Sequence, residues 1–359
     1  MTDVYEKLRE RLDMFPQGFP KTSSGVELEV LEHLFSPEEA EIALHMRPTI
    51  EAVSTIAERA GRDEKELSVI LYDMSKRGLI LRYTESEDSR YYLLAPWMVG
   101  IWEFQLNNLT DENIKLYERF YQEGMLPSKK NTTVPGFRVI PIEEEIMGIK
   151  EIQPFEKISE IINAQTRFAV APCICRKEAQ MVGDGCDKLL EACMMFGLAA
   201  DYYIENELAR EITKEEALQV LDKAEADGLI HFSSNHADDK VFICNCCGCC
   251  CKALAYLVKY DMPNAIGKSN YYAVLDKESC TDCEDCLDRC QVNAIRFEDG
   301  VTTIYEEKCI GCGLCVSVCP TESISMVIKS PEKYAPVYAN GDEMLQAIGK
   351  ERNKPYPFE

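Results

Sequence analysis

Eight cysteines in the C-terminal third of the chain occur in two runs with the same spacing. The first run follows C-x2-C-x2-C-x3-C and consists of Cys280, Cys283, Cys286 and Cys290. The second run repeats this spacing, is followed by Pro320, and consists of Cys309, Cys312, Cys315 and Cys319. Because the offset between the runs is constant, this part of the chain is an internal repeat, which we expect to form two strand–loop–helix units.

The spacing within each run suits iron–sulfur chemistry. Three thiolates on one tight loop can bind three corners of a [4Fe-4S] cube, and the fourth corner then faces away from the loop. We therefore expect each cluster to take its fourth ligand from the other repeat. Cluster I would use Cys280, Cys283, Cys286 and Cys319. Cluster II would use Cys309, Cys312, Cys315 and Cys290. Zinc or disulfides are the alternatives, but zinc sites pair two C-x2-C units and do not need the third cysteine of each run.

Over about residues 271–328 these motifs resemble the bacterial two-cluster ferredoxin family. The resemblance implies low-potential, one-electron transfer at both clusters. One departure is Gln291, which stands where the family usually has proline after the first run.

The two loops differ in character. The first carries acidic residues such as Asp282 and Glu284 between its cysteines, whereas the second carries apolar residues such as Ile310 and Leu314. We predict that cluster I lies at an acidic surface and cluster II inside. Negative charge near cluster I disfavours the addition of an electron, so cluster I should have the lower potential.

Ten further cysteines lie in two groups in the middle of the chain. The first group is Cys173, Cys175, Cys186 and Cys193. The C-x-C spacing would put the first two thiols on one side of an extended segment, and the basic residues beside them favour thiolates. Cys193 falls in an expected apolar helix over residues 192–203, where the alternative is a buried small side chain. The second group is Cys244, Cys246, Cys247, Cys249, Cys250 and Cys251.

No single geometry aims all six cysteines of the second group at one point. Cys244 and Cys246 would share a strand face, and Cys247 with Cys250 or Cys251 a helix face. They could serve two clusters, or complete one cluster together with the first group. We expect three or four [4Fe-4S] clusters in total, with a non-standard cluster as an alternative. A ferredoxin repeat behind such a cysteine-rich region is similar to an anaerobe ferredoxin-fusion family, which implies cluster binding and no particular activity.

Composition restricts the class of protein. The 359 residues carry a formal net charge of −23, which argues against nucleic-acid binding. The longest apolar stretch, residues 91–106, contains Pro96 and Glu103 and is too short to span a membrane. We recognise no signal sequence and expect a cytoplasmic protein. Its 18 cysteines then indicate metal binding in an anaerobic or strongly reducing cell.

Helix and turn signals predict an α+β chain, with mainly helical N-terminal and middle regions before the ferredoxin-like domain. An aspartate cap at Asp63 starts a helix to Lys76, and strands 79–83 and 90–94 follow around a polar tip, 84–89. This pattern predicts a winged helix. Its recognition helix and its tip, with Glu87 and Asp88, are acidic, so we expect protein docking or dimerisation and no DNA binding.

A similar helix and hairpin over residues 213–244 predict a second winged-helix-like unit. We expect His231 and His236 to be solvated hairpin residues, with metal ligation as the alternative. The predicted domains are winged-helix-like (1–110), connector (111–165), cysteine-rich helical (166–270), ferredoxin (271–328) and C-terminal tail (329–359).

These features favour an electron-transfer protein or subunit. Its partner would be a larger redox enzyme or a ferredoxin-like electron donor or acceptor, and a homo-oligomer is an alternative. The sequence has no G-x-G-x-x-G after a strand and no P-loop lysine, and we identify no catalytic residue. We therefore expect the electron-transfer subunit of an oxidoreductase complex more than a stand-alone enzyme. The alternatives are a reductase that works at a non-standard cluster and an iron–sulfur redox-sensing regulator.

Overall fold

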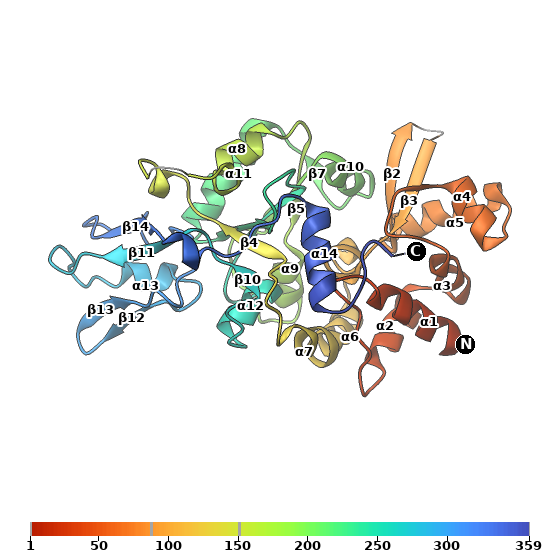
Figure 1. The fold of residues 1–359 in the computed structure, drawn as a ribbon, viewed down its shortest axis with the longest axis horizontal. Coiled ribbons are helices and arrows are strands. Elements are labelled where there is room, and N and C mark those ends of the chain that lie inside the picture. Colours follow the sequence, from red (N-terminus) through yellow and green to blue (C-terminus); the bar gives the residue numbers. More distant parts are fainter. Residues whose placement is uncertain (1, 87–88, 150–151, 359) are drawn as a thin grey trace. The chain divides into compact units, whose positions relative to one another are not determined.

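A computed structural model describes residues 2–86, 89–149 and 152–358 of the chain. The backbone forms an α+β structure of two compact units (Figure 1). The first unit consists of Met1–Asn131, Glu205–Leu208 and Leu345–Glu359. The second consists of Thr132–Ile204 and Ala209–Met344.

The first unit is mainly helical and has one small sheet. Its helices are α1 (Thr2–Asp13), α2 (Val26–Leu34), α3 (Pro37–Leu44), α4 (Val53–Ala60), α5 (Glu64–Lys76), α6 (Asp111–Phe120) and α7 (Leu126–Lys129). Its strands are β1 (Glu51–Ala52), β2 (Ile80–Ser86) and β3 (Ser89–Leu94), in the antiparallel order β1-β3-β2. Short turns are η1 (Trp97–Ile101), η2 (Glu103–Gln105) and η3 (Tyr121–Met125).

Helix α5 and the following hairpin lie where the sequence predicted them. The Asp63 carboxylate accepts hydrogen bonds from the amides of Lys65 and Glu66 and so caps the helix. The exposed residues of α5 include Glu64, Glu66 and Asp73. Glu87 and Asp88 of the expected tip lie outside the described residues, and the winged-helix class stays a prediction.

The second unit is built on a seven-stranded sheet. The strands are β4 (Phe137–Ile140), β5 (Phe168–Pro172), β6 (Glu191–Phe196), β7 (Arg210–Glu211), β8 (Ile230–Ser234), β9 (Phe242–Cys246) and β10 (Ile266–Gly267). The helices are α8 (Ile158–Asn163), α9 (Ile174–Met181), α10 (Gly197–Glu205), α11 (Lys214–Ala226) and α12 (Lys252–Val258). Short turns are η4 (Glu144–Ile146) and η5 (Pro154–Glu156).

The strand order is β10-β4-β8-β9-β6-β5-β7, and only the β10–β4 pair is parallel among the pairs of this sheet. Because side chains alternate along a strand, the sheet has two apolar faces. One face packs against α8 and α11, with Val170, Met194 and Ile243 in the core. The other face packs against α12 and carries Phe232 and Cys246.

Two expectations for this region are wrong. Residues 166–270 are not mainly helical, because the hairpin predicted within residues 213–244 contributes β8 and β9 to the large sheet, and α11 precedes them. Cys193 lies in strand β6, not in a helix over residues 192–203. A short run of apolar residues does not by itself distinguish a buried strand from a buried helix, and β6 is paired on both sides.

The C-terminal part of the second unit holds the two cysteine runs. Strand β11 (Tyr271–Leu275) pairs antiparallel with β14 (Ile324–Ile328), and β12 (Ile295–Glu298) with β13 (Val301–Ile304). Helix α13 (Asp285–Arg289) lies in the first run. Turn η6 (Pro331–Lys333) follows, and α14 (Gly341–Glu351) begins in this unit and continues into the residues of the first unit.

Candidate metal centres

Four thiols from both repeats line one partly open cavity in the ferredoxin-like domain. They belong to Cys280, Cys283, Cys286 and Cys319, the set predicted for cluster I. Glu284, Asp285 and Thr302 also line the cavity. The Asp282 carboxylate accepts a hydrogen bond from the Thr302 amide at 2.9 Å and so ties this loop to strand β13.

A second cavity is lined by the other four thiols. They belong to Cys309, Cys312, Cys315 and Cys290, the set predicted for cluster II. The remaining lining is apolar, apart from Arg289. Both cavities thus offer four thiols from two repeats, which is the donor set of a [4Fe-4S] cubane.

The surroundings of the two cavities differ as the sequence predicted. Cys283 is exposed, and so are the carboxylates of Glu284 and Asp285 beside it. The second loop is enclosed, because the Ile142 amide bonds to the Cys312 carbonyl at 3.0 Å and the Ser269 hydroxyl to the Gly311 carbonyl at 2.7 Å. Burial raises the pKa of Cys312 to about 12.

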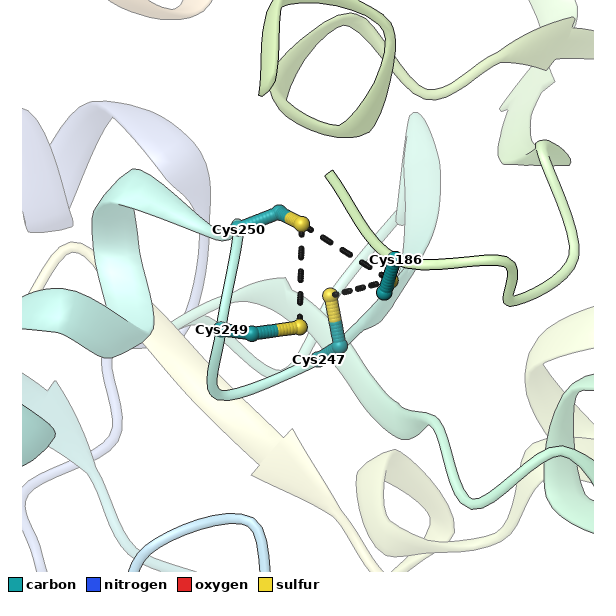
Figure 2. A group of neighbouring side chains, drawn as sticks. All are labelled: Cys186, Cys247, Cys249 and Cys250. Carbon is teal, nitrogen blue, oxygen red and sulfur yellow. Dashed lines mark hydrogen bonds between the residues drawn. The ribbon is translucent and has the colours of Figure 1, made fainter. Parts of the chain in front are cut away.

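Outside this domain, four thiols come together near the surface (Figure 2). The sulfur atoms of Cys186, Cys247, Cys249 and Cys250 all lie within 4.8 Å of one another. The Cys186 sulfur is 3.9 Å from that of Cys247 and 3.7 Å from that of Cys250. We call this group the four-thiol site. Its close sulfur contacts are those of a tetrahedral metal site, whose edges are about 3.8 Å when metal–sulfur bonds are about 2.3 Å.

The remaining six cysteines form a closed ring of thiol contacts, which we call the six-thiol ring. Each sulfur is in hydrogen-bond contact with two neighbours, and the ring closes on its first member. In order around the ring, the members are Cys173, Cys175, Cys251, Cys246, Cys244 and Cys193. Three members are buried and three are half-buried.

Two strands and two helix starts build the ring. Cys193 of β6 lies opposite Cys244 of β9, and Cys246 follows on the same strand face. Cys173 is the N-cap residue of α9, with Cys175 in the first turn of this helix, and the Cys251 thiol caps the start of α12. The C-x-C segment is therefore not extended as expected, although its two thiols do meet.

Hydrogen bonding within the ring makes its members alternate in acidity. Bonds from the Cys175 and Cys193 thiols hold the pKa of Cys173 well below its usual value. Bonds from Cys193 and Cys246 likewise lower the pKa of Cys244 to about 6. The donating thiols show the opposite shift, since their protons are shared with the thiolates.

A buried arginine lies between the ring and the four-thiol site. The Arg176 guanidinium bonds to the Asn245 carbonyl at 3.3 Å and to the Cys247 sulfur at 3.6 Å, and it also bonds to the Leu189 carbonyl. Burial lowers its pKa, but the neighbouring Cys173 and Cys247 thiols outweigh burial and raise it. In the part of the chain described by the structure, no carboxylate forms an ion pair with Arg176. Its charge therefore fits anionic thiolate centres on both sides.

The structure thus redistributes the two groups of the sequence. Cys186 leaves the first group and joins three cysteines of the second, and the other three join Cys173, Cys175 and Cys193. The two histidines are not solvated as expected. His231 is buried and bonds to the Asn245 side chain at 2.6 Å, and buried His236 bonds to the Ser234 hydroxyl at 2.7 Å.

The sequence alone did not reveal the roles of two residues, Arg176 and Gln291. Arg176 was noted only as a basic neighbour of the C-x-C pair, and Gln291 only as a departure from the family. The Gln291 side chain accepts a hydrogen bond from the amide of Gly248, in the loop of the four-thiol site. A polar residue in place of proline beside a cysteine-rich loop was the available signal.

The fold and the two four-thiol cavities define a ferredoxin-type iron–sulfur domain, and comparisons with known proteins agree. A family model described as a 4Fe-4S dicluster domain matches residues 273–326, which implies two [4Fe-4S] clusters. The chain is 35% identical over 102 residues to an uncharacterized ferredoxin of Methanocaldococcus jannaschii, an alignment that covers 28% of this chain and 59% of that protein. It is 43% identical over 54 residues to the pyruvate synthase subunit PorD of Thermotoga maritima, with 15% and 54% covered.

A ferredoxin of Streptomyces griseus is 30% identical over 74 residues, which cover 20% of this chain and 70% of that protein. Through its C-terminal domain, the chain belongs to the ferredoxin family. It spans little more than half the length of the Methanocaldococcus and Thermotoga relatives. In the described part of the chain, no helix has the length and apolar character needed to cross a membrane.

Proposed function

We propose that this protein is an electron-transfer subunit that passes low-potential electrons along several iron–sulfur centres to or from a redox enzyme. The observation that carries this proposal is the packing between cysteine sites. Cys246 and Cys251 of the ring share one apolar core with Ile310, Leu314 and Cys312 of the cluster II loop. This continuity would let electrons move between centres without crossing solvent.

The same continuity extends to cluster I. Cys309 and Cys315 pack in one core with Cys286, and Cys290 and Cys319 lie at its edge. In the proposed ligand sets, Cys290 completes cluster II and Cys319 completes cluster I. The route would therefore run from the middle cysteines through cluster II to cluster I, whose loop is exposed.

The four-thiol site is proposed to hold a third [4Fe-4S] cluster. Three of its cysteines lie on the single loop 247–250, and the fourth, Cys186, comes from a distant segment. Each ferredoxin cluster is likewise expected to take three cysteines from one loop and the fourth from another segment, whereas zinc sites pair two C-x2-C units. Binding a cubane would require the four sulfurs to move apart from their present contacts.

The electron partner is proposed to present a basic face to cluster I. Exposed carboxylates surround this cluster, among them Asp282, Glu284 and Asp285. Opposite charge across such an encounter speeds association and makes the rate depend on salt. PorD is named as a subunit of pyruvate synthase, and this supports a subunit role here.

Electron exchange with a second protein tests the proposal. The anaerobic full chain would be photoreduced and mixed with an oxidised two-cluster ferredoxin in a stopped-flow instrument. We expect rapid reoxidation that slows with increasing salt when the acceptor has a basic face, and slower reoxidation in the Cys319→Ser variant. Turnover of a substrate by the chain alone with an artificial electron donor would contradict the proposal.

A further inference from the structure

The six-thiol ring provides more sulfur ligands than a cubane can use. A [4Fe-4S] cluster has four irons, and each offers one terminal position to a thiolate. Six thiols in one ring therefore exceed that number by two. A single cubane would therefore leave two of the six thiols without iron.

The ring also does not suit a single tetrahedral ion. Such an ion needs four sulfurs that all contact one another, as they do at the four-thiol site. In the ring, each sulfur forms hydrogen-bond contacts with two neighbours, and the alternate members Cys173, Cys244 and Cys251 act on one another as charges at longer range. The six sulfur atoms thus surround a central space, and they do not converge on one point.

An ion pair, a backbone amide and a buried cation lie beside the ring. Glu178 of α9 and Lys252 of α12 form a buried ion pair at 3.2 Å, which joins the two helices whose starts carry ring cysteines. The Leu254 amide donates to the Cys251 sulfur at 3.4 Å. Arg176 adds a buried positive charge near Cys173, so thiolates in the ring have a fixed counter-charge.

We propose that the six-thiol ring binds one iron–sulfur centre with more than four irons through all six thiolates. Each thiol would lose its proton on binding, and the centre would differ from the cubanes of the ferredoxin-like domain. The inference concerns what the ring holds, and it stands whether or not the chain serves as an electron-transfer subunit. It also does not depend on whether the four-thiol site holds iron or zinc.

Metal analysis of paired variants tests this inference. The ring variant is Cys244→Ala with Cys251→Ala, and its matched control is Cys186→Ala with Cys249→Ala at the four-thiol site. Iron, zinc and acid-labile sulfide would be measured per chain after anaerobic purification of the full-length protein. We expect the ring variant to lose more than four irons with their sulfide, and the control to lose either about four irons or one zinc.

Mössbauer spectroscopy of the ⁵⁷Fe-loaded, unmodified chain provides a measurement that does not depend on a variant folding. We expect an iron component that differs from the cubane signal of the ferredoxin domain. The milder Cys193→Ser variant should reduce that component selectively. A spectrum of cubanes alone, zinc in the ring, or a ring variant that loses four irons or fewer would each overturn the inference.

Discussion

The backbone amide of Gly248 donates a hydrogen bond to the Gln291 side-chain oxygen Oε1 at 2.9 Å. Gly248 lies in the loop of the four-thiol site, and Gln291 directly follows Cys290 of the cluster II cavity. A proline at 291 would lack this acceptor. The departure from the ferredoxin pattern therefore joins the cysteine-rich region to the ferredoxin-like domain.

Gly248→Ala should disrupt this junction. The added Cβ would lie 2.3 Å from the Gln291 carbonyl oxygen, a backbone atom that cannot move independently. We expect a loss of about 1–3 kcal/mol in unfolding free energy and a loss of metal from the four-thiol site, with both ferredoxin clusters retained. Gln291→Ala should cost about 1 kcal/mol, since only the hydrogen bond is lost.

Anaerobic denaturation together with metal content per chain measures both effects. Gly341→Ala is a suitable control, because its nearest neighbour atom would be 3.7 Å from the new Cβ. Equal stability and metal content in the Gly248→Ala variant and this control would disprove the role of the junction.

The two ferredoxin clusters should differ in reduction potential. Cavity I is lined by Glu284 and Asp285, whereas cavity II is apolar and includes Arg289. Negative charge disfavours reduction and positive charge favours it, so cluster I should have the lower potential. Removing one charge by Glu284→Gln should raise the potential of cluster I by a few tens of millivolts, which corresponds to less than 1 kcal/mol at a solvated site.

An EPR-monitored redox titration would assign each potential, with Glu298→Gln on strand β12 as the control carboxylate outside either cavity lining. Loss of one signal in the Cys319→Ser variant identifies cluster I. A higher potential for cluster I than for cluster II would refute this account of their surroundings.

Arg176 should stabilise the middle centres. Its guanidinium lies within 3.6 Å of the Cys247 sulfur and is fully buried. Arg176→Met leaves anionic centres without a counter-charge, so we expect a loss of about 3–5 kcal/mol in stability and less iron per chain. Where metal is retained, potentials of the middle centres should fall by on the order of 100 mV.

Arg176→Lys keeps the charge and loses the forked contacts, so it should fall between the parent and Arg176→Met in both measurements. If the methionine variant kept the iron content and potentials of the parent, Arg176 would not serve as the counter-charge.

Mild acid should destabilise the second unit through buried histidines. Burial, followed by the charge of Lys240, lowers the pKa of His236 to about 4. Because the unfolded histidine titrates near pH 6.5, this stability is present above that pH and is lost as the pH falls towards 4. The loss should be on the order of 1–3 kcal/mol, and buried His231 shifts in the same direction.

Denaturation midpoints between pH 7 and pH 4 measure this slope. His236→Gln cannot titrate and should give a shallower slope, whereas His33→Gln, at an exposed position, should leave it unchanged. An identical slope in the His236→Gln variant would show that another group controls the acid response.

Spacing in the sequence was enough to predict which thiols share each ferredoxin cavity, because three ligands on one loop require a fourth from elsewhere. It did not predict the partition of the ten other cysteines. Cys186 and Cys247 meet only because the large sheet brings distant segments together. We predicted a helix at Cys193 because a run of five apolar residues does not show the alternation that identifies a strand. Only the pairing of Cys193 with Cys244 in the sheet reveals the ring.

In the proposed function, electrons pass between the ferredoxin clusters and the middle cysteine centres within one chain. Freeze-quench EPR after mixing the anaerobic protein with a low-potential ferredoxin measures this transfer directly, and Cys290→Ser, which should remove cluster II, provides the comparison. We predict reduction of cluster I first and of the middle centres later, with the later phase slowed at least tenfold in the variant. Reduction of the middle centres at the same rate with and without cluster II would contradict the account.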